Sequence, residues 1–342
     1  MTNESLEYSE KDWIIELGVR PHKMSPIDPP TIENNEEYDR ILASIYAMTL
    51  ADGLLTHLID PYILEHIQME KEFSEHDDIA LVWSDDVSLT LCFLASLAHH
   101  GGYSQDHLLE RYFQWWMNRK PSSYMCPAGH CFTPRVHLKK SIDLFGETQA
   151  AHALGITVDM ERKTSKLIAT PSSLLRLSPI AYFYSKHSST KRVEIIQDCI
   201  KRMFGTKTSS TIFIAYIDLL VNAFNGLSKD EILRSVQVQS SSNDLLTKTF
   251  FDLIDVITND NNNIEQGIQY ALERKQIHKQ ECKYLNPYDS DETILLTLYL
   301  QTSAAIYNSI PDRLLKQIYA KETIQSLAKW IIYQRNENLR ST

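Results

Sequence analysis

The chain has 342 residues, of which 43% are hydrophobic and 23% charged, and its formal net charge is −10 at pH 7. This composition is that of a globular protein with a large core, and the negative charge argues against a general binder of nucleic acid or of an anionic membrane. Glycine is scarce, with 10 residues against a usual ~7%, which favours a helical fold over a glycine-rich α/β nucleotide fold.

Cysteine usage and hydropathy indicate the compartment. Five cysteines occur, an odd number without framework spacing, which is typical of a reducing environment. The first twelve residues are polar and acidic and do not resemble a secretory signal. The longest apolar run, 212–224, is interrupted by Asp218 and Asn222 and therefore predicts a buried helix, not a membrane span. We expect a cytoplasmic monomer that binds neither membrane nor nucleic acid.

The chain divides into a short lead segment and one long helical domain. Residues 1–36 are polar and hold four prolines, so we expect an irregular segment with a short helix near 11–17, held to the body by Trp13 and Ile14. Apolar residues at helical spacing begin at Glu36 and continue to the end, which predicts one domain over 37–338. The first helix of this domain is expected to end near Asp52-Gly53.

The remaining predicted elements are almost all helices. A loop rich in proline and cysteine covers 119–134, a polar loop covers 259–263, and the best strand signal is 166–169. Helical spacing and end signals predict helices at 62–73, 84–99, 105–118, 136–151, 172–186, 190–203, 208–225, 228–236, 243–258, 264–275, 290–308, from 311 onward, and 322–335.

The segment Trp83-Ser84-Asp85-Asp86 is the first candidate site. Its two carboxylates follow a hydroxyl and precede an apolar helix, so they lie in the first turn of a buried element. Oxygen ligands on a rigid element suit a hard cation such as Mg²⁺. Ordinary helix capping explains the same pattern, because carboxylates are stabilised near the positive end of the helix dipole.

A second acidic helix start, Asp289-Ser290-Asp291-Glu292-Thr293, carries the same kind of oxygen-rich tip. If the two starts face each other, their hydroxyls and carboxylates form a site for one or two divalent cations. Neither start has the Glu or Gln at the third helical position that a capping box requires, which favours the metal interpretation. Asp52 and Asp60, near the end of the first helix, are further acidic candidates.

Two other motifs predict little. His76-Asp77-Asp78 resembles a metal phosphohydrolase dyad, but it lies in a polar turn without a spaced ligand set. The segment Cys126-Pro127-Ala128-Gly129-His130-Cys131 offers three zinc-type ligands without a second pair, so packing of a loop explains it better.

In this order, the motifs resemble the ADP-ribosylglycohydrolase family over about residues 40–335. The family's Gly-Asp-Ala-Leu-Gly is similar to Ala51-Asp52-Gly53-Leu54-Leu55, and its Trp-Thr-Asp-Asp-Thr to Trp83-Ser84-Asp85-Asp86-Val87. Its Asn-Gly-x-Leu-Met-Arg-x-x-Pro resembles the segment from Pro171 to Pro179, and its Gly-Gly-Asp-x-Asp-Thr resembles 289–293, followed by Ile310-Pro311.

The resemblance implies an all-α orthogonal helical bundle that hydrolyses an ADP-ribose glycosidic bond in a protein or a small molecule with Mg²⁺. Two ions are implied, or one if the second motif is degenerate. Arg176 is expected to be structural. The resemblance assigns Asp60, or else Asp52, to catalysis as the assisting acidic residue. It assigns Ser172, Ser173 and His130 to substrate binding. The predicted metal ligands are Ser84, Asp85, Asp86, Asp289, Asp291, Glu292 and Thr293.

Departures from the family pattern leave alternatives open. The second motif fits in two registers, one pairing Ser290 with Glu292-Thr293 and the other pairing Asp289 with Asp291. The alternative to an enzyme is a degenerate member of the same fold that binds ADP-ribose or a protein.

The Asn-, Lys- and Ile-rich composition is typical of an AT-rich genome, and such divergence would suit an effector that an intracellular bacterium secretes into a host cell.

Overall fold

The computed structural model describes residues 24–31, 35–59, 83, 85–118, 169–203, 209–236, 238, 244–281 and 291–341, together with positions 11, 13, 14 and 21. Within the helices, the side chains at 55–59, 85, 113–118, 202, 274–281, 291–293 and 313 are not described. The predicted helices at 62–73 and 136–151 lie outside the described residues, as does most of the expected strand at 166–169, of which only Ala169 is described, without regular structure.

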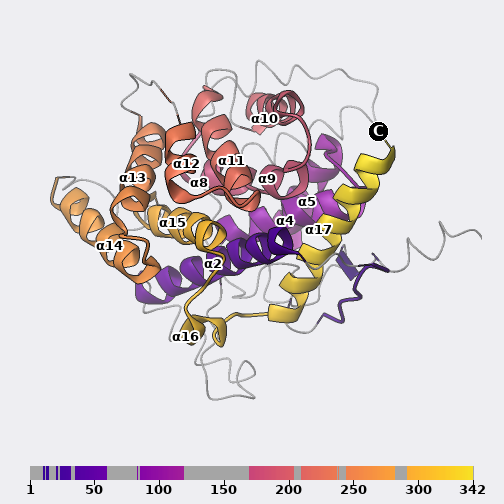
Figure 1. The fold of residues 1–342 in the computed structure, drawn as a ribbon. Helices are drawn as coiled ribbons and strands as arrows, with labels where there is room; N and C mark the ends of the chain where they lie inside the picture. The colour runs from indigo at the N-terminus through magenta and orange to yellow at the C-terminus, as the bar shows by residue number, and fades with distance from the viewer. Residues whose placement is uncertain are drawn as a thin grey trace, which may run out of the picture.

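All regular secondary structure in the described part of the chain is helical (Figure 1), which confirms the predicted all-α class. The helices are α2 (Glu36–Ile59), α4 (Asp85–His100), α5 (Gln105–Asn118), α8 (Ser172–Leu177), α9 (Pro179–Tyr184), α10 (Ser189–Met203), α11 (Thr211–Phe224), α12 (Lys229–Ser235), α13 (Leu245–Asn259), α14 (Ile264–Glu281), α15 (Asp291–Tyr307), α16 (Asp312–Leu315) and α17 (Lys321–Ser341).

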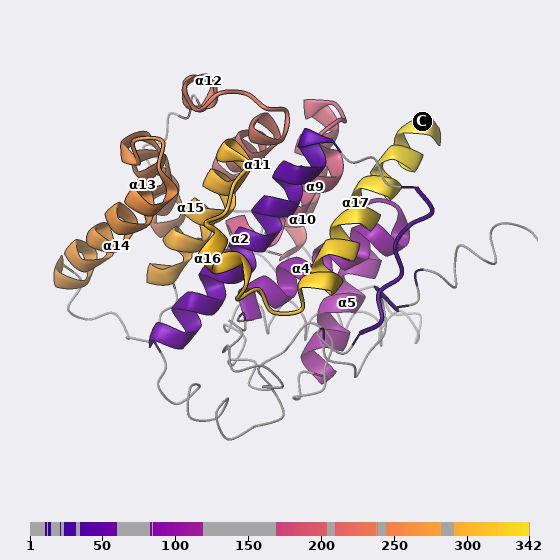
Figure 2. The ribbon, with the colours of Figure 1, turned by 60° about the horizontal axis from the view of Figure 1, so that its bottom comes forward.

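Helices α2 and α15 form the antiparallel pair at the centre of the fold. The Arg40 Nη1 donates to the carbonyls of Ala305 and Ile306, each at 2.8 Å, and the Ser44 hydroxyl donates to the carbonyl of Gln301 at 3.0 Å. A step of four residues towards the C-terminus of α2 therefore matches a step of about four residues towards the N-terminus of α15. Figure 2 shows α2 running between α15 on one side and α17 on the other.

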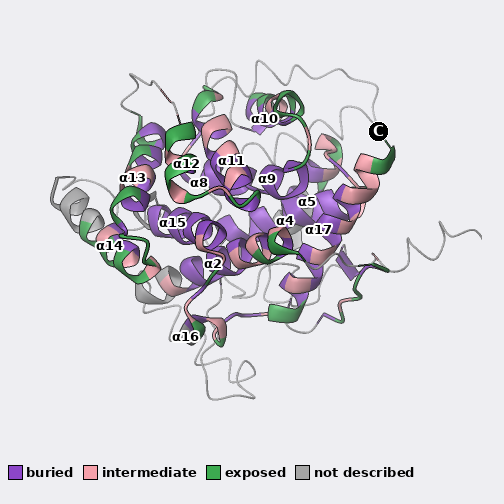
Figure 3. Ribbon diagram, in the orientation of Figure 1, coloured by how far each residue is buried: buried purple, intermediate pink, exposed green. Residues whose placement is uncertain are grey.

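The central helices are buried around most of their circumference. Figure 3 shows buried residues along nearly all of α4, α9 and α15, whereas α10, α12 and α14 keep exposed faces. A helix that is apolar on all sides can be stable only inside a large protein or a membrane. Within the described part of the chain, no helix combines the length and apolarity that crossing a membrane requires.

A buried glutamine joins four of these helices. The Gln301 Nε2 donates to Ser178 Oγ at 2.9 Å and to Tyr182 OH at 2.7 Å, and the Tyr216 hydroxyl donates to Gln301 Oε1. The Ser44 and Tyr182 hydroxyls lie 3.0 Å apart. Because every one of these polar groups is buried, the network fixes the relative positions of α2, α9, α11 and α15.

Two predicted helix boundaries are wrong. The first helix does not end at Asp52-Gly53 but continues to Ile59. Glycine inside a helix costs only about 1 kcal/mol relative to alanine, and packing around the buried Gly53 outweighs that cost. The predicted helix 172–186 is two short helices that meet at Ser178, because Pro179 has no N–H to continue the hydrogen-bond ladder.

The other described helices agree closely with the sequence patterns. Most begin and end within about three residues of the predicted positions, while α14 and α17 extend six residues further, to Glu281 and Ser341. The lead segment docks as expected: Trp13 and Ile14 are helical and buried. The indoles of Trp13 and Trp330 both donate to the carbonyl of Ile27, at 3.2 and 2.7 Å, so this segment is held against α17.

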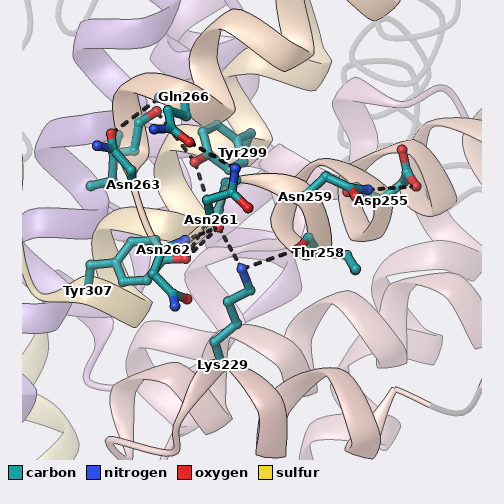
Figure 4. A network of polar contacts seen from close by, with 12 residues as sticks. Lys229, Asp255, Thr258, Asn259, Asn261, Asn262, Asn263, Gln266, Tyr299 and Tyr307 are labelled. Carbon is teal, nitrogen blue, oxygen red and sulfur yellow. Dashed lines mark hydrogen bonds and ion pairs between the residues drawn. The ribbon is translucent and has the colours of Figure 1, made fainter.

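The corner between α13 and α14 is built around Asp260. Its carboxylate is fully buried and accepts hydrogen bonds from Lys229 Nζ at 2.6 Å, Tyr307 OH at 2.8 Å and Tyr299 OH at 3.1 Å. The backbone N–H of Asn262 adds a fourth donor at 3.0 Å. Figure 4 shows how these side chains converge from α12, α15 and the corner itself.

Candidate functional site

The start of α4 places one predicted metal ligand in the protein interior. Trp83 is 1% exposed and meets Tyr319 edge to face at 5.2 Å, which anchors the chain just before the helix. Asp86 lies in the first turn and is 6% exposed. The carbonyl of Asp86 accepts a hydrogen bond from the Thr90 hydroxyl at 2.8 Å. The carboxylate is therefore held at the positive end of a buried helix, where the helix dipole stabilises it.

Arg176 of α8 lies beside this carboxylate. Its Nε is 3.6 Å from Asp86 Oδ1, and the two side chains are 1% and 8% exposed. The distance is too long for a hydrogen bond, but a guanidinium this close compensates the charge of a carboxylate in the low-dielectric interior. Burial raises the pKa of the nearby Tyr112, although the charge of Arg176 acts in the opposite direction.

The predicted substrate residues Ser172 and Ser173 begin α8 and are fully buried. The Arg176 Nη2 donates to Ser172 Oγ at 2.5 Å, and the Ser172 and Thr170 hydroxyls lie 3.0 Å apart. Ser173 exchanges hydrogen bonds with Thr170, from its N–H to the Thr170 carbonyl at 2.8 Å and from the Thr170 N–H to its hydroxyl at 3.1 Å. The structure thus joins this segment to Asp86 through one guanidinium.

Asp52 is buried on α2, at 7% exposure. The hydrogen bond between Ser44 and Gln301 sets the register of α2 against α15. Eight residues on from Ser44 is Asp52, and eight residues back from Gln301 is Thr293, in the first turn of α15. The antiparallel register therefore brings Asp52 to the level of the second acidic helix start.

Several predicted site residues cannot be placed in this geometry. Asp60, Ser84, His130 and Asp289 lie outside the described residues. For four other residues the structure describes a helical backbone but not the side chain: Asp85, Asp291, Glu292 and Thr293. Among the side chains that are described, no group of three or more His, Cys, Asp or Glu residues could hold a metal ion.

The described part of the site fits a hard cation in its donor chemistry. Asp86 and Asp52 are buried carboxylates, and the metal ligands predicted in the two motifs all supply oxygen, the ligand atom that Mg²⁺ prefers. Arg176 was expected to be structural, but its contacts with Asp86 and Ser172 were not predicted. The available signal was its position four residues after Ser172, which puts both on one face of a helix.

A protein family and a solved structure are similar to this chain. A family model described as ADP-ribosylglycohydrolase matches residues 33–304. A solved structure titled "ADP-ribosylglycohydrolase-related protein complex" is similar over 88% of this chain and 99% of that chain, with 16% sequence identity and a TM-score of 0.48. No curated protein sequence matches significantly.

Proposed function

The chain belongs to the ADP-ribosylglycohydrolase family, and from this premise we propose that it hydrolyses the glycosidic bond of ADP-ribose attached to a protein or a small molecule, with Mg²⁺. The observation that carries the proposal is the buried carboxylate of Asp86 in the first turn of α4. It lies in the segment that resembles the family's metal motif, within the matched residues.

We propose that Asp85, Asp86 and Ser84 hold one side of a Mg²⁺ site. The first turn of α15 would hold the other side, through Asp291, Glu292 and Thr293 or, in the alternative register, through Asp289 and Asp291. When bound, the cation would neutralise the clustered carboxylates and make a water molecule more acidic and more nucleophilic.

The remaining roles fall to residues that contact the sugar and the water. The bond to the leaving group breaks through a cation-like ribose, which nearby carboxylates stabilise. Asp60, or else Asp52, would accept a proton from the attacking water. The α2–α15 register supports Asp52, because it brings this buried residue to the level of Thr293. We assign Ser172, Ser173 and His130 to substrate binding.

One experiment tests the activity. The protein is incubated with ADP-ribosylated protein, and released ADP-ribose is measured with magnesium and with EDTA. The double variant Asp85→Asn with Asp86→Asn should release none above background. The matched control is Asp106→Asn, an exposed aspartate in the first turn of α5, which should release as much as the wild type. Unchanged release by the double variant would show that the site is elsewhere.

A second candidate function is binding without catalysis. The pairing of Asp86 with Arg176 favours it, because a carboxylate already compensated by a guanidinium has less need of a cation. Calorimetric titration with ADP-ribose separates the two candidates. Tight binding that requires magnesium supports the hydrolase, whereas tight binding that EDTA leaves unchanged, without release of ADP-ribose, supports the binding protein.

A further inference from the structure

Arg176 carries a positive charge in the interior, 1% exposed, where an uncompensated ion is very costly. Its stem lies on α8, its Nη2 donates to Ser172, and its Nε faces Asp86 at 3.6 Å. The guanidinium therefore lies between a carboxylate at the start of α4 and a hydroxyl at the start of α8.

We propose that Arg176 is the internal counter-charge of Asp86: it compensates this carboxylate in the absence of a cation and so holds the start of α4 in place. The inference deepens the proposed function, since it concerns the same carboxylate. Clustered carboxylates repel one another unless a positive charge lies among them. A permanent guanidinium supplies that charge for Asp86 when no cation is bound.

This role makes Arg176 a positioning residue, because it acts through Asp86 and Ser172. A guanidinium cannot lose its proton in a protein, so the compensation holds at any pH at which the protein is folded. The 3.6 Å separation compensates charge without forming a hydrogen bond to the carboxylate. The same guanidinium holds Ser172 by a hydrogen bond, which ties the substrate segment to the metal segment.

The test is a set of variants examined by thermal unfolding. Arg176→Met keeps the apolar stem and removes the positive charge that lies 3.6 Å from the buried Asp86 carboxylate. We expect a lower melting temperature, and we expect magnesium to restore part of it. The rise on going from EDTA to millimolar magnesium should exceed the wild-type rise by about 3 °C or more. Arg176→Lys, which keeps the charge, should respond as the wild type does.

The matched control is Arg335→Met. Arg335 is 2% exposed and pairs with Glu37 at 2.7 Å, in a different part of the fold. This variant should also unfold at a lower temperature, but its response to magnesium should equal that of the wild type. A response as large as that of Arg176→Met would mean that any broken interior ion pair creates cation dependence, and would overturn the proposal.

A second measurement does not involve a metal. Asp86→Asn removes the carboxylate, so in the Arg176→Met background it should raise the melting temperature in EDTA, whereas in the wild-type background it should lower it. If the two substitutions lower the melting temperature additively, Asp86 and Arg176 are not charge partners and the proposal fails. This design remains informative if Arg176→Met alone does not fold, because the double variant should then recover folding.

The two proposals fail in different ways. If wild-type unfolding and ADP-ribose binding do not respond to magnesium, the metal-dependent hydrolase is wrong, while the coupling between Asp86 and Arg176 in EDTA still decides the counter-charge. If the wild type responds to magnesium and Arg176→Met responds no more strongly, the hydrolase stands and the counter-charge is wrong.

Discussion

Two buried aspartates, Asp260 and Asp86, illustrate two ways of keeping a carboxylate in the interior. Asp260 accepts hydrogen bonds from an ammonium group, two phenols and a backbone N–H, at 2.6–3.1 Å. Asp86 faces its guanidinium across 3.6 Å, which is beyond hydrogen-bonding distance. The first arrangement satisfies the carboxylate with the protein's own donors; the second compensates its charge without a hydrogen bond from its cation.

The locations of the two residues match this difference. Asp260 lies between α13 and α14, and its hydrogen bonds connect these helices to α12 and α15. Its contribution is therefore to the stability of the fold. Asp86 opens a helix in the segment that resembles the family's metal motif. We therefore expect Asp260 to stabilise the fold, and Asp86 remains the carboxylate of the proposed site.

The largest effect is expected from Asp260→Asn. The substitution removes the charge that pairs with Lys229, whose side chain is only 12% exposed, and places an amide donor against two phenol donors. Breaking one partner of a buried pair costs about 3 kcal/mol or more, which urea unfolding would measure. The control is Asp230→Asn, an exposed position next to Lys229, which should change stability by less than about 0.5 kcal/mol. If Asp260→Asn lowers the free energy of unfolding only slightly, Asp260 does not have the stabilising role that distinguishes it from Asp86.

A smaller effect is expected from Gly267→Ala in α14. A Cβ at this position would lie 1.8 Å from the Tyr299 hydroxyl and 2.1 Å from its Cζ, so Tyr299 would have to move away from Asp260. Overpacking costs about 1–3 kcal/mol, and the better helix propensity of alanine returns up to about 1 kcal/mol. We expect a net loss of about 1–2 kcal/mol.

The same urea measurement gives the controls for Gly267→Ala. Gln269→Ala, on an exposed position of the same helix, should be close to neutral. In the Asp260→Asn background, Gly267→Ala should cost less than it does in the wild type, because the hydrogen bond of Tyr299 is already weakened. If the losses of unfolding free energy caused by the two substitutions simply add, Gly267 does not act through the hydrogen bonds of Asp260.

Much of the helical fold could be predicted because long apolar faces at helical spacing give a strong signal. The errors have local causes. Gly53 signalled a helix end, but packing on both sides of α2 outweighed its weak propensity. Pro179 was predicted to lie inside one helix, but its missing N–H interrupts the hydrogen-bond ladder, and α8 ends at Leu177. The stretch 259–263 was correctly predicted as a loop, but its aspartate was not singled out.

The site was less predictable than the fold because it depends on contacts between distant segments. Asp86 was identified from the acidic pair at a helix start, and Ser172 from the family resemblance. Nothing in their local sequence shows that Arg176 lies between them, since Asp86 and Arg176 are 90 positions apart and meet only in the packed structure. Asp52 was named, but its position opposite the start of α15 follows from the register set by Ser44 and Gln301.

The smallest effect is expected from His107, whose titration makes the stability depend on pH. Burial, followed by the charges of Arg111, His99 and His100, lowers the pKa of His107 to about 4 from its usual value of 6.5. The unfolded chain therefore binds this proton from about pH 6.5 downward, and the folded protein only near pH 4. Stability contributed by neutral His107 is complete above pH 6.5 and is lost as the pH falls towards 4.

His107→Gln should flatten the loss of stability between pH 6.5 and 4, as measured by urea unfolding at several pH values. The substitution keeps a polar group near Ser96, whose hydroxyl lies 2.7 Å from His107 Nδ1. The comparison variant is His187→Gln, because burial also lowers the pKa of His187. Each variant should reduce the slope of stability against pH only by the contribution of the histidine that it replaces. If neither variant alters the slope, the loss of stability in this pH range belongs to other groups and the prediction for His107 is wrong.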